Sequence, residues 1–268
     1  MTLDTARPKP NWVSRLAHPG AFMAWSRPVL WPLGILMALV FAGGLWLALL
    51  GSPADYQMGD TVRIMYIHVP NAILSEGVYG VMFLAALGTL VWRHPLADVT
   101  ARAAAPLGAV FTGMALYSGS LWGRPTWGTF WEWDGRMTST LILLFIYLGI
   151  IALWRAFDDQ LRAARIVAVV TLVGALDIPV VKFSVDWWNT LHQPASLTLG
   201  GSKLPPEMLT PLGVMALAFG LLFVLLLLVG MRTEILRRRA DTMSRQAVAA
   251  RQEESVAARQ DGTATGST

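Results

Sequence analysis

The chain of 268 residues contains no cysteine. Without thiols it can form no disulfide bond, offers no thiolate ligand to a metal ion and has no thiol nucleophile. Any metal must therefore be held by nitrogen, oxygen or methionine sulfur. Histidine is also scarce. The sequence has only four, so the possible role of each imidazole as a ligand can be considered from its position.

Charged side chains are few as well. They make up 14% of the chain, against 54% for hydrophobic ones, whereas about 25% of residues are charged in an ordinary soluble domain. The charges gather in short clusters between apolar runs close to the ~20 residues that a helix needs to cross a bilayer. Six runs fit: Val29–Leu50, Ala72–Trp92, Ala103–Leu121, Thr138–Trp154, Ala163–Val181 and Met208–Met231. The sequence therefore predicts an all-α integral membrane protein with six transmembrane helices.

Basic residues divide unequally between the two sides of this predicted bundle. Sixteen of the 21 Lys and Arg fall on the side that carries both termini. The other side has five, namely Arg63, Arg124, Arg136, Lys182 and Lys203. Because Lys and Arg favour cytoplasmic loops, we predict an N-in/C-in topology. We interpret the net positive charge as the charge that orients the helices in the lipid membrane, and not as a nucleic-acid binding surface. The outer connections, 51–71, 122–137 and 182–207, are the longer ones, so we expect the site in the outer-face loops.

Three segments follow from this pattern. We predict a cytoplasmic N-terminal segment over 1–28, a six-helix transmembrane domain over 29–231 and a basic cytoplasmic tail over 232–268. The first apolar run follows a polar lead without a cleavage pattern, so we expect no cleaved signal peptide. The tail lacks apolar periodicity, which predicts a frayed helix and then a largely disordered segment. Arg237–Arg239 would hold it near anionic headgroups.

The connection over 122–136 is unusually rich in tryptophan. Four of the twelve tryptophans lie within twelve positions, at Trp122, Trp127, Trp131 and Trp133. Tryptophan is enriched at membrane interfaces, which is how we interpret the scattered Trp12, Trp31 and Trp92. Here Gly123, Pro125, Gly128 and Gly135 predict a defined, turn-rich backbone in addition. We therefore predict an aromatic platform for a flat, conjugated, largely apolar ligand, and porphyrin fits that description.

Two of the four histidines lie on the outer side, where this loop is. His68 precedes the second apolar run and His192 follows a Trp-Trp pair, whereas His18 and His94 are cytoplasmic. Neutral imidazole on each face of a haem would give a six-coordinate iron. Zinc is less favoured, because its sites need three or four protein ligands.

Outer cations could pair with the two haem propionates. Arg63, five residues before His68, and Arg136, two after Asp134, are the first choices, although topological or ion-pair roles stay open. Glu76 and Asp177 lie inside apolar runs, where an ionised group needs water or a partner. Glu76 could serve a proton path or a partner helix, and Asp177 could satisfy backbone groups freed by Pro179. We assign catalysis to neither.

The segment Trp122–Ser139 resembles the tryptophan-rich WWD signature of a haem-handling protein family, with Met137 where leucine is usual. Together with six helices and flanking outer histidines, it is similar to the cytochrome c maturation protein C branch of that family. The resemblance implies a cytochrome c assembly domain over 29–231 in the bacterial inner membrane, with its functional face in the periplasm. It also implies transient, non-covalent binding of b-type haem, with His68 and His192 as iron ligands. Trp122, Trp127, Trp131, Trp133 and Asp134 would form the haem-presenting loop.

The implied role is haem delivery for c-type cytochrome biogenesis, without a classical catalytic site. The implied partners are a periplasmic haem chaperone (cytochrome c maturation protein E), ABC-transporter-like subunits and a small single-span protein. Three alternatives stay open: a haem lyase of the same superfamily, a membrane cytochrome b-like electron carrier and a secondary transporter. The lyase is disfavoured by the short chain with one pair of outer histidines, and the carrier because no apolar run contains a histidine. For the transporter, Pro179 and Pro211 do not form a matching pair of interruptions.

Overall fold

The computed structural model describes residues 18–264, apart from 189, 193–196, 199, 200 and 203. Its helices are α2 (Pro19–Trp46), η1 (Leu47–Gly51), η2 (Asp60–Ile64), α3 (Met65–Leu90), α4 (Ala97–Trp127), α5 (Gly135–Ala156), α6 (Gln160–Gly174), α7 (Asp177–Trp187) and α8 (Pro206–Ala264). Two-residue strands, β1 (Leu197–Thr198) and β2 (Gly201–Ser202), form a small antiparallel ribbon between α7 and α8.

Six segments of the described chain are long and apolar enough to cross a membrane, which confirms the predicted helical membrane protein. They are Pro19–Gly51, Asp60–Leu90, Ala97–Trp127, Gly135–Ala156, Gln160–Trp187 and Pro206–Gln252. Most helices start earlier or end later than their apolar runs. The first helix begins at Pro19, so residues 19–28, predicted as part of the polar lead, are helical.

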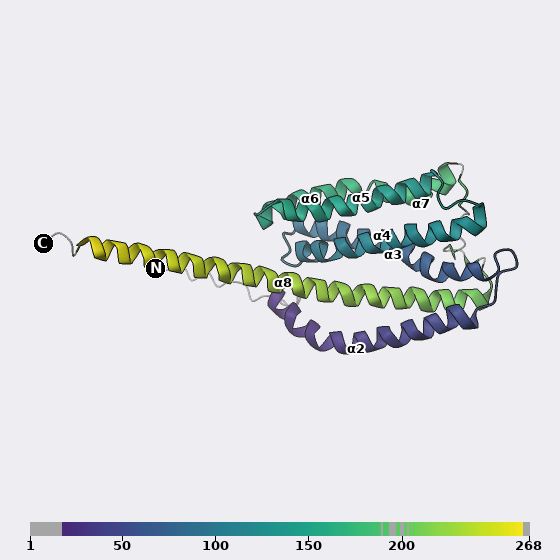
Figure 1. Ribbon diagram of the computed structural model, residues 1–268, viewed down its shortest axis with the longest axis horizontal. Coiled ribbons are helices and arrows are strands. Elements are labelled where there is room, and N and C mark those ends of the chain that lie inside the picture. Colours follow the sequence, from purple (N-terminus) through teal and green to yellow (C-terminus); the bar gives the residue numbers. More distant parts are fainter. Residues whose placement is uncertain (1–17, 189, 193–196, 199–200, 203, 265–268) are drawn as a thin grey trace, which may run out of the picture.

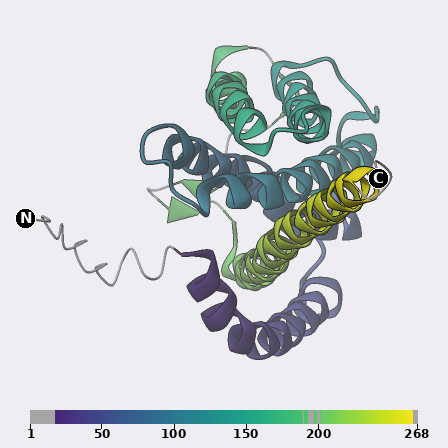
Figure 2. The same cartoon turned by 90° about the vertical axis from the view of Figure 1, so that its left-hand side faces the viewer.

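The helices form a layered bundle with its axes roughly parallel. α3 and α4 make the centre, α2 and α8 pack on one side, and α5, α6 and α7 cover the other (Figures 1 and 2). The N-terminal end of α2 lies at the end of the bundle from which α8 protrudes (Figure 1). The start of α8 and the end of α7 lie at the opposite end, where the predicted outer site belongs.

Two buried tyrosines join the centre of the bundle to the α5–α6 layer. The rings of Tyr79 on α3 and Tyr147 on α5 meet edge to face with their centroids 5.4 Å apart. The Tyr79 hydroxyl donates to the Thr171 carbonyl at 3.0 Å, and the Tyr147 hydroxyl donates to the Ser75 carbonyl at 2.8 Å. A Cβ on Gly108 would lie 2.1 Å from Tyr147 Cε1, so only glycine leaves room for this ring. These bonds satisfy buried polar groups and fix the layers against one another.

The predicted fifth helix is broken. The apolar run Ala163–Val181 is divided between α6 and α7, with the break at Ala175 and Leu176. Pro179 has no N–H to donate to the Ala175 carbonyl four residues earlier, and its ring would collide with that carbonyl in a regular helix. The Ile178 N–H bonds to Ala175 instead, at 3.2 Å. Asp177 therefore lies in the first turn of α7.

The sequence predicted a frayed and then largely disordered tail, and the structure differs from this prediction. α8 continues as one helix to Ala264 and projects beyond the bundle (Figure 1). Its composition of Ala, Arg, Gln, Glu and Met explains this, because these residues have high helix propensity even without an apolar stripe. Glu234 also anchors the helix through ion pairs with Arg102, Arg237 and Arg238, at 3.4, 2.9 and 2.7 Å.

Candidate functional site

The tryptophan segment is half helix and half loop. α4 runs through Trp127, so Trp122 and Trp127 stand on its last turns rather than in the loop predicted over 122–136. The helix ends at Gly128, which has φ +81° and donates its N–H to the Arg124 carbonyl at 3.0 Å. A left-handed residue that ends a helix is usually glycine, which lacks the Cβ that would strain this conformation. Only residues 128–134 are irregular.

His68 lies in the first turn of α3, near the start of the second membrane-crossing segment, where the sequence predicted the start of the second helix. Its Nδ1 lies 3.0 Å from the Ala115 carbonyl oxygen and 3.2 Å from Ser118 Oγ. A carbonyl can only accept, so Nδ1 carries the proton and Nε2 keeps a free lone pair. A Cβ on Gly119 would lie 2.8 Å from His68 Cε1, so this glycine makes room for the ring.

The imidazole of His192 forms a hydrogen bond with the carboxylate of Asp134. Its Nδ1 lies 2.7 Å from Asp134 Oδ2, which also accepts a short hydrogen bond from the Thr190 hydroxyl. Asp134 Oδ1 accepts from the Met137 N–H at 2.8 Å and so caps α5. Thr190 in turn accepts from the His192 backbone N–H at 3.1 Å. Asp134 was predicted to belong to the ligand-presenting loop, and the structure places it as the support of His192.

Burial and hydrogen bonding set the charge states of this pair. Burial of the Asp134 carboxyl would raise its pKa, but hydrogen bonds from Thr190, Met137 and His192 outweigh burial and hold the pKa below its ordinary value. Burial lowers the pKa of the His192 imidazole, although the bond to Asp134 opposes the change. At neutral pH the pair is therefore carboxylate and neutral imidazole, and Nε2 of His192 keeps its lone pair.

Each histidine packs edge to face against a tryptophan of α4. The His68 and Trp122 ring centroids are 5.8 Å apart, and those of Trp127 and His192 are 4.6 Å apart. Within the described part of the chain, no hydrogen bond reaches Nε2 of either ring. The structure thus places two imidazoles, each with a free ring nitrogen, against two indoles near the end of α4.

The other two tryptophans of the segment pair with each other. The rings of Trp131 and Trp133 are 5.3 Å apart and nearly perpendicular. Trp133 is 73% exposed. Thr129 shapes this stretch, because its hydroxyl donates to the Trp131 carbonyl at 2.9 Å. Among the described residues, neither ring contacts a histidine ring. Trp131 is half-buried, so Trp133 is the exposed member of this pair.

The two predicted propionate partners differ in their surroundings. Arg63 forms an ion pair with Asp60 at 3.1 Å and donates to the Ser52 carbonyl at 3.3 Å. Arg136 donates to the Lys182 carbonyl at 3.2 Å. In the part of the chain that the structure describes, the buried Nε of each has no hydrogen-bond partner. Each guanidinium therefore has one N–H group that these contacts do not use.

Three supporting residues escaped the sequence analysis. Thr190 stands two residues before His192, a spacing typical of a hydroxyl that bonds a nearby backbone N–H, and this signal was available. Ser118 and Gly119 touch His68 from about 50 positions away. No local pattern points to such contacts. The described residues hold no cluster of three or more His, Asp or Glu that could bind a bare metal ion.

Comparison with known proteins identifies the family. The model described as heme exporter protein C matches residues 12–246. The chain is 62% identical over 229 residues to the heme exporter protein C of Bradyrhizobium diazoefficiens, covering 85% of this chain and 87% of the relative. For the proteins of that name from Escherichia coli K12 and Paracoccus denitrificans, the identities are 49% over 185 residues and 42% over 226. These matches cover 69% and 83% of this chain, and 75% and 93% of the relatives. The chain therefore belongs to the heme exporter protein C family.

Proposed function

We propose that this protein binds haem at the periplasmic face of the bacterial inner membrane and presents it to a periplasmic haem chaperone for c-type cytochrome biogenesis. One observation carries the proposal. His68 and His192 both donate through Nδ1 and keep Nε2 free at the same end of the bundle. The relatives named heme exporter protein C support haem as the ligand.

In this proposal the two Nε2 atoms ligate the haem iron. Hydrogen bonds on Nδ1 orient an imidazole and raise its basicity as a ligand, which the Ala115 carbonyl does for His68 and Asp134 does for His192. Trp122 and Trp127 cover apolar ring area beside the imidazoles. Haem is a transient, non-covalent b-type cargo here, so the protein is a transfer protein and not a classical enzyme.

The propionates would bind Arg63 or Arg136, and the surroundings favour Arg136. Its guanidinium has no carboxylate within ion-pair distance among the described residues, whereas Arg63 is already paired with Asp60. A charge-assisted bond to a buried Nε would also satisfy a group that is otherwise unpaired.

Two exposed aromatic side chains beside the site would contact the chaperone. Phe130 and Trp133 are 54% and 73% exposed, and exposed aromatic side chains are enriched in protein interfaces. A chaperone bound there would stand next to the iron ligands. The further partners of the proposal are ABC-transporter-like subunits and a small single-span protein, in addition to membrane lipid.

The visible spectrum of the purified protein tests the ligands. We expect a Soret band that weakens or shifts in both His68→Ala and His192→Ala after equal haem supply, because each removes an axial ligand. His94→Ala, at the cytoplasmic end, is the matched control and should leave the band unchanged. A band indifferent to both outer substitutions would remove the ligand assignment.

A cytochrome b-like electron carrier is the second candidate, because His68 lies in a helix as the ligands of such carriers do. The two functions differ in the fate of the haem. Transfer of haem from the loaded protein to the purified chaperone supports delivery. Retention of haem, together with reversible reduction by a quinol, supports the electron carrier.

A further inference from the structure

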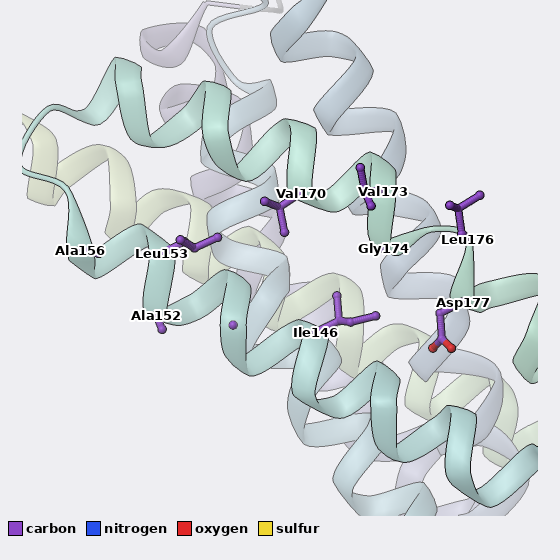
Figure 3. A pocket seen from close by; sticks show the side chains of 10 residues that line it. Ile146, Ala152, Leu153, Ala156, Val170, Val173, Gly174, Leu176 and Asp177 are labelled. Atoms are coloured by element: carbon purple, nitrogen blue, oxygen red, sulfur yellow. The ribbon is translucent and has the colours of Figure 1, made fainter.

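An apolar groove runs along the outside of the α5–α6–α7 layer, away from the histidine site. Its volume is about 770 Å³, and α5 and α6 form its walls (Figure 3). Gly149 and Ala152 lie on one wall, Val170 and Val173 on the other, and Asp177 at the end near the α6–α7 break. Because both walls belong to membrane-crossing segments, the groove opens to the interior of the bilayer.

Asp177 is the one charged or polar side chain among the ten residues that line the groove. Its Oδ2 is buried and has no hydrogen-bond partner among the described residues. The carboxylate does not satisfy the backbone freed by Pro179, since Ile178 bonds to the Ala175 carbonyl. The hydroxyl of Tyr79 is also committed, to the Thr171 carbonyl. An unpaired acidic group inside a membrane is unfavourable and marks a site where a partner is missing.

Small residues make the groove suitable for a helix. Gly149 and Ala152 stand on the same face of α5, and small side chains allow two helix backbones to approach closely in a membrane. A Cβ on Gly149 would meet nothing within 4 Å, so the space above this residue is open. Aliphatic side chains line the rest of the walls, so the occupant needs an apolar face as well as one polar group.

We propose that this groove binds a transmembrane helix of another protein, whose Lys, Arg, Asn or Ser side chain donates to Asp177. Charge complementarity selects this occupant. A lipid chain would fill the apolar walls but leave the carboxylate unpaired. Asp177 lies ten residues before Trp187 at the outer end of α7, about 15 Å along a helix, so a lipid headgroup amine would not reach it. The propionates of haem would be repelled by it.

Photocrosslinking in native membranes tests the proposal, with the full chain carrying benzoylphenylalanine at Gly149. The matched control places it at Gly80 on α3, another exposed glycine whose Cβ would meet nothing within 4 Å. We expect an adduct from position 149, but not from 80, that maps to a membrane-spanning helix with a donor side chain. An adduct with lipid only, or with a second copy of this chain, would overturn the proposal.

Substitutions then test the role of the carboxylate. Asp177→Leu should lower the adduct yield roughly tenfold, the size expected for one interhelical hydrogen bond. Gly149→Leu should abolish co-purification of the partner, whereas Gly80→Leu should not. The charges can also be exchanged by combining Asp177→Lys with an acidic residue at the donor position of the partner. This combination should restore the adduct. Haem binding should persist in every variant, which shows that the bundle is folded. Equal yields for wild type and Asp177→Leu would refute the pairing.

Discussion

Nδ1 of His192 lies 2.7 Å from Oδ2 of Asp134, which stands 58 positions earlier in the chain. The same carboxylate caps α5 through its other oxygen, so the orientation of one imidazole is tied to the start of a membrane-crossing helix. A site residue on a long connection thereby gains the rigidity of the bundle. Four substitutions test how far the site and the fold depend on such supports.

Asp134→Asn should weaken haem binding about 10- to 100-fold, the usual effect of removing a supporting partner of a ligating histidine. The amide can still cap α5 through its oxygen, but its NH₂ group then faces two donors, the His192 ring and the Thr190 hydroxyl. A haem titration followed at the Soret band measures the loss. Glu132→Gln, on the exposed part of the same loop, is the control. Equal affinity of wild type and Asp134→Asn would show that the bond does not orient the ring.

Thr190→Val should weaken haem binding by less than Asp134→Asn, because the carboxylate remains and only the hydroxyl is lost. The hydroxyl both donates to Asp134 and accepts from the His192 N–H. A loss of roughly 3- to 10-fold corresponds to one hydrogen bond of about 1 kcal/mol. Thr190→Ser keeps the hydroxyl and should restore the affinity. If valine and serine behave alike, the hydroxyl has no part in the site.

Gly119→Ala should displace the His68 imidazole, since the new Cβ would lie 2.8 Å from its Cε1. We expect haem affinity to fall at least about tenfold, as for the loss of a well-placed ligand contact. Gly113→Ala, on the same helix, meets nothing within 4 Å and should leave haem binding unchanged. It should even stabilise α4, by up to about 1 kcal/mol. Identical Soret titrations of the two variants would contradict the close packing at Gly119.

Glu234→Ala should loosen the part of α8 where the helix begins to project beyond the bundle. Glu234 is 7% exposed and pairs with Arg102, Arg237 and Arg238. Its removal takes the carboxylate away from Arg102 and Arg237, whereas Arg238 keeps its ion pair with Asp98. Breaking a buried ion pair by removing one partner costs about 3–5 kcal/mol. Trypsin should therefore cleave after Arg237 and Arg238 faster than in wild type. The Asp241→Ala variant, changed two turns beyond Glu234, should be cleaved at the wild-type rate. An equal rate for Glu234→Ala would exclude an anchoring role.

Much of the fold could be predicted from the chain itself. Apolar length and sparse charge determine membrane-crossing helices locally, because a backbone in lipid must satisfy its own hydrogen bonds. The boundaries were less predictable. α4 continues through Trp127 although the glycines and proline there indicated a loop, and α8 continues through a tail without apolar periodicity. In both cases the helix continues past the end of its apolar run, and local composition could not distinguish such a helical extension from a loop.

The sequence by itself determined the six membrane-crossing helices and the tryptophan cluster, and it predicted that His68 and His192 lie on one side of the membrane, because these features depend on hydropathy, charge and order along the chain. Only the tertiary structure decided which nitrogen of each imidazole is free. The bonds from His68 to Ala115 and from His192 to Asp134 join positions 47 and 58 residues apart. Such contacts depend on how helices pack, and side-chain packing across helices has no period or spacing in the sequence.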